Sequence, residues 1–304
     1  MRERWKRMFP VVGLVALIVI AALYLGKNRR RPQPTLSFAV AEEDLRSYKE
    51  IEARFEARDF TGLAGRIESL FASLPAGSPV RCHLAMAYAK MGRREAEKAA
   101  GYLAKDGGKF KGEGEALRLG CLGDIDLYYL DRPEEAAGYY EQSLPLAPSV
   151  AYMSLASLFK VYSGHRRTFD RDKAEECLAK LSEFRDSPHF AVAMMIGLAM
   201  AGGERESALR GLDWLESQLP AEDLPTERVY CAPIWGWLGD AEKAVEYLKP
   251  GLMEQASGYS PEGFRIYCDW NRQNPAYDSI RDDAGFVAMW EQLYAFEPRP
   301  AGKE

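Results

Sequence analysis

The sequence predicts an all-α chain. Apolar residues recur at helical spacing almost throughout its 304 residues, and the alternating β-branched stretches that strands need are nearly absent. With 47% apolar and 28% charged residues, the chain can build one large domain or an extended array with a continuous core. An uncharged apolar run near the N-terminus predicts one membrane-spanning helix before this helical body.

The apolar run covers residues 8–26, between a basic tail (1–7) and a basic, proline-containing linker (27–41). As a helix, its nineteen residues span about 28 Å, close to the roughly 30 Å hydrocarbon core of a bilayer. A cleaved signal peptide is the rival interpretation. It is disfavoured because Arg29, Arg30 and Arg31 follow the run and no small-x-small cleavage site does. We therefore expect an uncleaved, single-pass anchor.

Charge is unevenly distributed along the chain. Residues 1–31 carry a net charge of +7, which leaves −12 for the remainder because the whole chain carries −5. An acidic body argues against nucleic-acid binding. Basic clusters on both sides of the anchor nearly balance the positive-inside rule, so the side of the membrane stays open. We expect the N-terminus inside and the body outside the cytoplasm, although the second basic cluster and the unpaired cysteines favour the opposite arrangement.

Residues 42–257 contain an approximate repeat. Six alanines mark it, at intervals of 32, 40, 38, 34 and 36 residues: Ala64, Ala96, Ala136, Ala174, Ala208 and Ala244. Large residues follow four positions after two of them, at Tyr140 and Leu248. The preceding helices carry partial matches, of which Tyr152, Leu155, Ala156 and Phe159 are the fullest. The first helices around Leu117–Leu130 and Ile196–Met200 depart from the pattern.

This pattern resembles the tetratricopeptide repeat (TPR) family, whose signature is W-x2-L-G-x2-Y, then A-x3-F, then P. The resemblance implies about six antiparallel helix hairpins, stacked into a right-handed superhelical solenoid. Its small residues let the two helices of a hairpin approach, and its large ones fill the space beside them. The resemblance also implies that the first helix of each hairpin lines a concave surface.

Local signals mark turns and helix starts within the repeat. Asp131 and Glu134 have the spacing of a capping box, and Ser78-Pro79 predicts an N-cap followed by a proline in the first turn. Two insertions interrupt the period, "DGGKFKGEGE" (106–115) and "SGHRRTFDRD" (163–172). The second is basic, and we expect His165 to lie in a solvated loop there.

The C-terminal segment, residues 258–304, differs from the repeats. Its stretch "NPAYDSIRDDAGF" is similar to a segment that often closes TPR regions in bacterial regulatory proteins, and this implies a cap on the last hairpin. Asp278 and Asp283 are expected to cap helix starts, and Arg281 to pair with a carboxylate. A binding role for Asp278 and Arg281 remains an alternative. The residues expected to cover the last hairpin are Tyr277, Ile280, Phe286 and Trp290.

No catalytic motif is present, so we expect a protein that is not an enzyme and that holds no cofactor or metal. His83, His165 and His189 lack ligand spacing. Five scattered cysteines lie in apolar helical contexts, which predicts buried thiols rather than disulfides or a zinc site. They are Cys82, Cys121, Cys177, Cys231 and Cys268.

Function is therefore expected on the concave groove. The resemblance places six residues there: Met153, Ser157, Lys160, Ala193, Gly197 and Met200. A methionine-bearing apolar surface suits a helix or an extended peptide, although methionines at helical spacing also occur in cores. We expect a membrane-anchored, non-catalytic adaptor that binds a protein partner. A holding chaperone of an envelope-assembly, secretion or proteolysis machine is the main alternative, and an enzyme on a helical scaffold has no motif in its favour.

Overall fold

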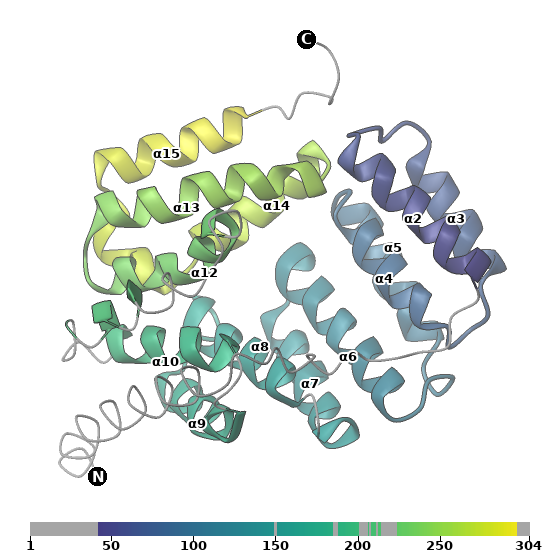
Figure 1. The fold of residues 1–304 in the computed structure, drawn as a ribbon, viewed down its shortest axis with the longest axis horizontal. Coiled ribbons are helices and arrows are strands. Elements are labelled where there is room, and N and C mark those ends of the chain that lie inside the picture. Colours follow the sequence, from purple (N-terminus) through teal and green to yellow (C-terminus); the bar gives the residue numbers. More distant parts are fainter. Residues whose placement is uncertain are drawn as a thin grey trace, which may run out of the picture.

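The computed structural model describes residues 42–148, 151–184, 188–200, 206, 208–210, 212–213 and 224–296 (Figure 1). Within these ranges the regular structure is entirely helical, as predicted. No helix in this part of the chain is long and apolar enough to cross a membrane. The expected anchor at 8–26 lies outside it, as do the basic tail and the linker.

The helices, in chain order, vary from 11 to 15 residues. They are α2 (Glu42–Glu56), α3 (Leu63–Ser73), α4 (Pro79–Ala89), α5 (Arg93–Lys105), α6 (Glu113–Ile125), α7 (Pro133–Ser143), α8 (Ala151–Gly164), α9 (Arg171–Leu181), α10 (Pro188–Met200), α12 (Leu224–Trp237), α13 (Ala241–Gln255), α14 (Pro261–Arg272) and α15 (Ala284–Ala295). Short segments join some of them: the π-helix η1 (Asp126–Leu130) and the 3-10 helices η2 (Leu144–Leu146), η4 (Ser182–Phe184), η5 (Ala256–Gly258) and η6 (Pro275–Ile280).

Consecutive helices pack in pairs: α2 with α3 is the first pair, α4 with α5 the second, α6 with α7 the third, α8 with α9 the fourth, and α12 with α13 the last. The first helices of neighbouring pairs are also in contact: α4 with α6, α8 with α10, and α10 with α12. In Figure 1 the pairs follow one another around the molecule, and the end of the α13 region returns to α2, which η5 contacts. The first and last helices of the array are therefore neighbours.

The repeat alanines lie between the paired helices. Five are fully buried, and Ala64 is half-buried. Small residues let the helices of the third pair come close, because a Cβ added to Gly123 would lie 2.6 Å from the ring of Tyr140. The buried alanines are Ala96, Ala136, Ala174, Ala208 and Ala244; Tyr140, Leu155, Ala156, Phe159 and Leu248 are buried with them, and Tyr152 is half-buried.

Side-chain caps begin several of the helices. Asp170 accepts from the backbone N–H of Lys173 at 3.1 Å, and Asp240 accepts from that of Lys243 at 3.0 Å. Each bond satisfies a backbone donor that the first helical turn leaves without a partner. Asp240 is the aspartate of the Gly239-Asp240 turn, so this turn ends α12 and starts α13.

The third pair departs from the repeat because its first helix ends in a π-helix. After α6 the chain winds through η1 and then places Asp131 in the left-handed region, at φ 56°. A π-helical turn holds an extra residue, which shifts the side chains that follow relative to an α-helical pattern. The unusual sequence around Leu117–Leu130 thus has a local structural cause.

Two predictions about this region are wrong. Asp131 and Glu134 form no capping box: the residue before α7 is Arg132, which makes no side-chain cap bond. Asp131 instead accepts from Nε2 of His165 at 3.0 Å. His165 is fully buried rather than solvated, because the 163–172 insertion folds back onto the turn of the third pair. Its Nδ1 accepts from the backbone N–H of Arg167, so Nε2 carries the proton.

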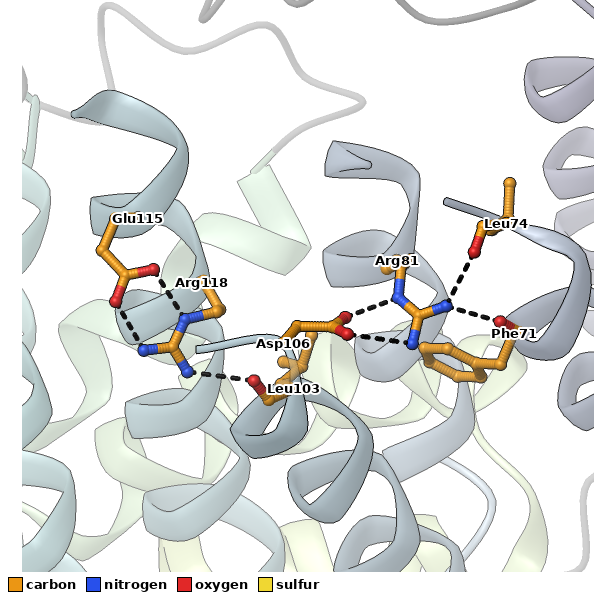
Figure 2. Close-up of polar contacts among 7 residues, drawn as sticks. All are labelled: Phe71, Leu74, Arg81, Leu103, Asp106, Glu115 and Arg118. Atoms are coloured by element: carbon orange, nitrogen blue, oxygen red, sulfur yellow. Dashed lines mark hydrogen bonds and ion pairs between the residues drawn. The ribbon is translucent and has the colours of Figure 1, made fainter. Parts of the chain in front are cut away.

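Two buried arginines, Arg81 and Arg118, bond to the C-terminal end of the helix pair that precedes their own. Arg81, on α4, forms a bidentate pair with Asp106 and donates to the backbone carbonyls of Phe71 and Leu74 at the end of α3 (Figure 2). Arg118, on α6, donates to the carbonyl of Leu103 near the end of α5 at 3.0 Å. Arg81 thus bonds to carbonyls at the end of α3, where the last helical turn leaves carbonyls without helical partners, and Arg118 adds a second donor to the Leu103 carbonyl, which also accepts from the backbone N–H of Asp106 at 3.2 Å.

All five cysteines are free and buried, as predicted. Burial raises the pKa of the Cys177 thiol to about 11 and that of Cys268 to about 12. These thiols pack as small apolar groups.

Candidate functional site

The C-terminal segment reaches far beyond the last helix pair. Residues 259–280, which we name the strap, run across the turns that join the first and second helices of several pairs. Figure 1 shows α14, the helix of the strap, extending from the α13 region towards α2 and α5. Helix α14 contacts both α5 and η1.

At the second pair the strap meets the turn between α4 and α5. The backbone N–H of Ser260 donates to the carbonyl of Lys90 at 3.2 Å, and its hydroxyl donates to the carbonyl of Met91. Glu262 accepts from the N–H of Arg93 at 3.2 Å. A Cβ on Gly263 would overlap the carbonyl of Lys90, so the two backbones are in direct contact.

At the third pair the contact is aromatic. Tyr128 meets Trp270 edge-on, with ring centroids 4.6 Å apart, and Tyr129 lies 6.4 Å from Tyr259. Tyr259 stacks in turn on Tyr267 at 5.1 Å. The π-helix η1 thus presents two tyrosines to the strap.

The strap continues to the fourth and last pairs. Gly164 faces the side chain of Asn274, and Arg166 pairs with Asp278. At the turn after α12, Ser279 donates to the carbonyl of Gly236 at 3.1 Å. The strap therefore joins four separate turns of the array.

Beyond the strap, α15 packs on α13. The residues expected to cover the last pair, Tyr277, Ile280, Phe286 and Trp290, are buried, and Asp283 caps α15 through the N–H of Phe286 at 3.0 Å.

Asp278 caps no helix, and this prediction is wrong. Asn274 begins η6 instead, through the N–H of Ala276 at 2.9 Å. Partial burial raises the pKa of Asp278, but hydrogen bonds from Arg281 and Arg166 outweigh it and hold the pKa below its ordinary value. Arg281 has the carboxylate partner that we expected, at 2.8 Å.

A pocket of about 110 Å³ opens between α6, α7 and α8. This volume has room for several water molecules. Its walls combine two carboxylates, four hydroxyls and several apolar groups: Glu113, Asp124, Tyr140, Ser143, Ser154, Ser157, Ala116, Leu117, Gly120, Cys121, Ala147 and Met153.

Asp124 and Tyr140 form the polar part of the wall. The Tyr140 hydroxyl donates to Asp124 at 2.7 Å. Burial raises the pKa of Asp124, while this hydrogen bond and the nearby charge of Lys160 act in the opposite direction. Lys160 lies on α8 with its ammonium 4.8 Å from the ring centre of Tyr230, on α12. A carboxylate, an ammonium and an aromatic ring thus follow one another beside the pocket.

The predicted groove residues separate into two groups. Met153, whose surface is 49% exposed, and Ser157 line the pocket, and Lys160 lies one turn further along α8. Ala193, Gly197 and Met200, all on α10, are buried, at 3% exposure for Ala193 and 7% for Met200. The α10 residues therefore belong to the packing between helices and leave α6 and α8 as the accessible face.

Sequence reasoning missed Asp124 and Tyr230. Gly120 and Asp124 are four residues apart, which places them on one face of a helix, and this spacing was the available signal for Asp124. Tyr230 carried no comparable signal, because it meets Lys160 only through the packing of distant helices. In the part of the chain that the structure describes, no group of three or more His, Cys, Asp or Glu residues could hold a metal ion.

Comparisons with protein-family models, with curated proteins and with solved structures found no match.

Proposed function

We propose that the chain is a membrane-anchored, non-catalytic TPR-like scaffold that binds a segment of a protein partner at the pocket between α6 and α8. In this proposal the helix pairs form a right-handed solenoid, and residues 8–26 hold it at the membrane. Buried alanines between paired helices support the solenoid. The uncharged run of nineteen residues supports the anchor.

One observation carries the binding role: a pocket on the face of two successive first helices, with Met153 exposed at its mouth. A flexible methionine adapts to different apolar surfaces, and the hydroxyls behind it can orient a peptide backbone. Attachment to a membrane raises the local concentration of a partner, so a small contact suffices.

A photocrosslinking amino acid at position 153 tests this proposal in cells. We expect one or two discrete protein adducts from position 153 and none of these from position 176, because Glu176 is exposed on α9, outside the pocket lining. The same adducts from both positions would refute the pocket assignment. A broad spread of adducts from position 153 alone would favour the holding chaperone.

A second variant distinguishes binding in the pocket from non-specific crosslinking. Ser157→Trp places a large ring in the pocket, so the crosslinker at position 153 should lose its adducts in this background. Adducts that persist at full intensity would show that the partner binds elsewhere.

We further propose that the N-terminus lies inside and the body outside the cytoplasm. A reporter active on only one side of the membrane, fused after Glu304, tests this orientation. Reporter activity in the cytoplasm would show the opposite orientation, with the body inside.

A further inference from the structure

We propose that the pocket between α6, α7 and α8 receives a basic side chain of the partner, lysine or arginine. In this arrangement the cationic head lies beside Asp124 and the methylene stem lies against Met153. The inference deepens the proposed function and rests on it for the place where the partner binds. What it adds is the chemistry of the residue that enters the pocket.

The charged groups that line the pocket are both carboxylates. Glu113 stands in the first turn of α6, and Asp124 stands eleven positions later, near the end of the same helix. Eleven residues complete about three turns, so both carboxylates lie on the face of α6 that borders the pocket. No lysine, arginine or histidine is among the lining residues, and Lys160 lies beside them with its ammonium at the ring of Tyr230. The wall therefore attracts positive charge.

The hydroxyl protons of the pocket are already donated to partners within the protein. Tyr140 donates to Asp124 at 2.7 Å, and Ser143 donates to the backbone carbonyl of Tyr140, also at 2.7 Å. Because the proton of Ser143 points to that carbonyl, Ser154 is the donor in the 2.6 Å bond between the two serines. For the same reason, Ser157 is the donor in its hydrogen bond with the Tyr140 hydroxyl.

The lining side chains are thus left as acceptors. The two carboxylates only accept, and the four hydroxyl oxygens keep lone pairs while their protons are committed. A carboxylate or phosphate of a partner would meet repulsion and no donor. An ammonium or a guanidinium carries donors alone, so it complements this wall.

The carboxylate of Asp124 gains most from such a ligand. Burial raises its pKa, and this effect outweighs the hydrogen bond from Tyr140 and the charge of Lys160, which act in the opposite direction. The ionised form of Asp124 is therefore incompletely compensated by the groups around it. A bound cation would supply a charge-assisted hydrogen bond at this carboxylate.

The mouth of the pocket suits a methylene stem. Met153 is exposed there, one helical turn before Ser157, and Leu117 adds an apolar group from α6. A Cβ added to Gly120 meets nothing within 4 Å, so the space in front of this residue is open. Lysine and arginine lay their methylene groups along apolar surface and keep the charged head on polar groups. The net charge of −12 on residues 32–304 also attracts basic segments.

Peptide binding to the purified full chain in detergent micelles, titrated by saturation-transfer NMR, tests the inference. Three acetylated alanine pentapeptide amides differ in their central residue: lysine, norleucine, which keeps the stem and lacks the charge, and glutamate. We expect the lysine peptide to bind on the order of tenfold more tightly than the norleucine peptide, because hydrogen bonds between charged groups are the stronger ones. Equal affinities for these two peptides, or a preference for glutamate, would overturn the proposal.

Asp124→Asn assigns the preference to the pocket. Asparagine keeps an acceptor for Tyr140 and removes the charge, so the lysine preference should disappear. Asp172→Asn is the matched control and should keep the preference, because Asp172 is exposed on α9, outside the pocket lining. A preference that survives in Asp124→Asn would overturn the proposal. If that variant does not fold, Ser157→Trp takes its place and should abolish binding of the lysine peptide.

The same titration separates two other sources of a cation. n-Butylammonium, which has the head and stem without a peptide, should bind more weakly than the lysine peptide, and equal affinities would assign the pocket to a free amine. Replacing Arg29, Arg30 and Arg31 by glutamine should leave the affinity for the lysine peptide unchanged. A rise in affinity would show that the chain's own basic cluster occupies the pocket. Either of these contrary results would overturn the assignment to a partner.

This test and the crosslinking at position 153 fail independently. Adducts from position 153 without a preference for the lysine peptide would keep the proposed function and remove this inference. A preference for the lysine peptide without cellular adducts would do the reverse.

Discussion

Asp126 offers a sharp test of the energetics of η1. The Asp126 side chain is 6% exposed, its Oδ1 accepts no hydrogen bond, and Nη1 of Arg132 lies 3.8 Å from that oxygen. Burial raises its pKa from 3.8 to about 6, against the attraction of Arg132. We expect Asp126→Asn, which keeps the shape and removes the charge, to stabilise the protein at neutral pH.

The magnitude follows from proton linkage. The pKa is higher in the folded state, so the folded state binds the proton more tightly, and stability is lost as the pH rises from about 4 through about 6. The rise in the pKa from 3.8 to about 6 corresponds to about 3 kcal/mol, because each tenfold change in proton affinity is worth about 1.36 kcal/mol. The variant should therefore exceed the parent protein by about 3 kcal/mol at pH 7.5 and match it near pH 4.

Urea unfolding followed by circular dichroism between pH 4 and 7.5 measures this difference. Comparing variant with parent cancels the titration of all other groups. Asp282→Asn is the control: the side chain is exposed, and its removal should leave the pH profile unchanged. A difference that does not grow with pH would refute the reasoning, as would an Asp126→Asn protein no more stable than the parent at pH 7.5.

Three further predictions follow from packing and burial. Arg81→Met leaves the Asp106 carboxylate buried without its partner, so urea unfolding should show a loss of about 3–5 kcal/mol, and a loss below 1 kcal/mol would contradict the role of this pair. Gly123→Ala forces a methyl group against the ring of Tyr140, and we expect the melting temperature to fall with a loss of about 1–3 kcal/mol; unchanged melting would mean that the helices move apart freely. Burial lowers the pKa of His165 below its ordinary value of 6.5, so folding disfavours the protonated imidazole. The stability that the neutral ring contributes is therefore present above pH 6.5 and is lost as the pH falls below 6.5. His165→Gln should flatten the acid side of the stability profile, and an unaltered profile there would argue against this effect.

The local order of the chain was predictable from its sequence. Helical periodicity, the buried cysteines and the cap at Asp283 all depend on residues a few positions apart, whose spacing sets which face of a helix they share. The resemblance to the repeat family placed Met153 and Ser157 on the expected groove, and both line the pocket.

Side chains with two possible partners were predicted poorly. Asp131 has the spacing of a helix cap, but the π-helix before it turns the backbone into the left-handed region and directs its carboxylate to His165. The sequence around a cap shows which bonds are possible. Only the packing of the 163–172 insertion decided which of them forms.

The course of the strap was decided by the tertiary structure alone. Arg93 and Glu262 are 169 positions apart and meet because the packing of the helix pairs brings the C-terminal segment onto the turn between α4 and α5. No local pattern encodes a contact between residues so far apart in the chain. By itself the sequence determined that the chain forms helices and which faces they bury. The tertiary packing determined that the strap lies across four turns, that the α10 residues of the expected groove are buried, and that Met153 and Ser157 on α8 line a pocket with α6.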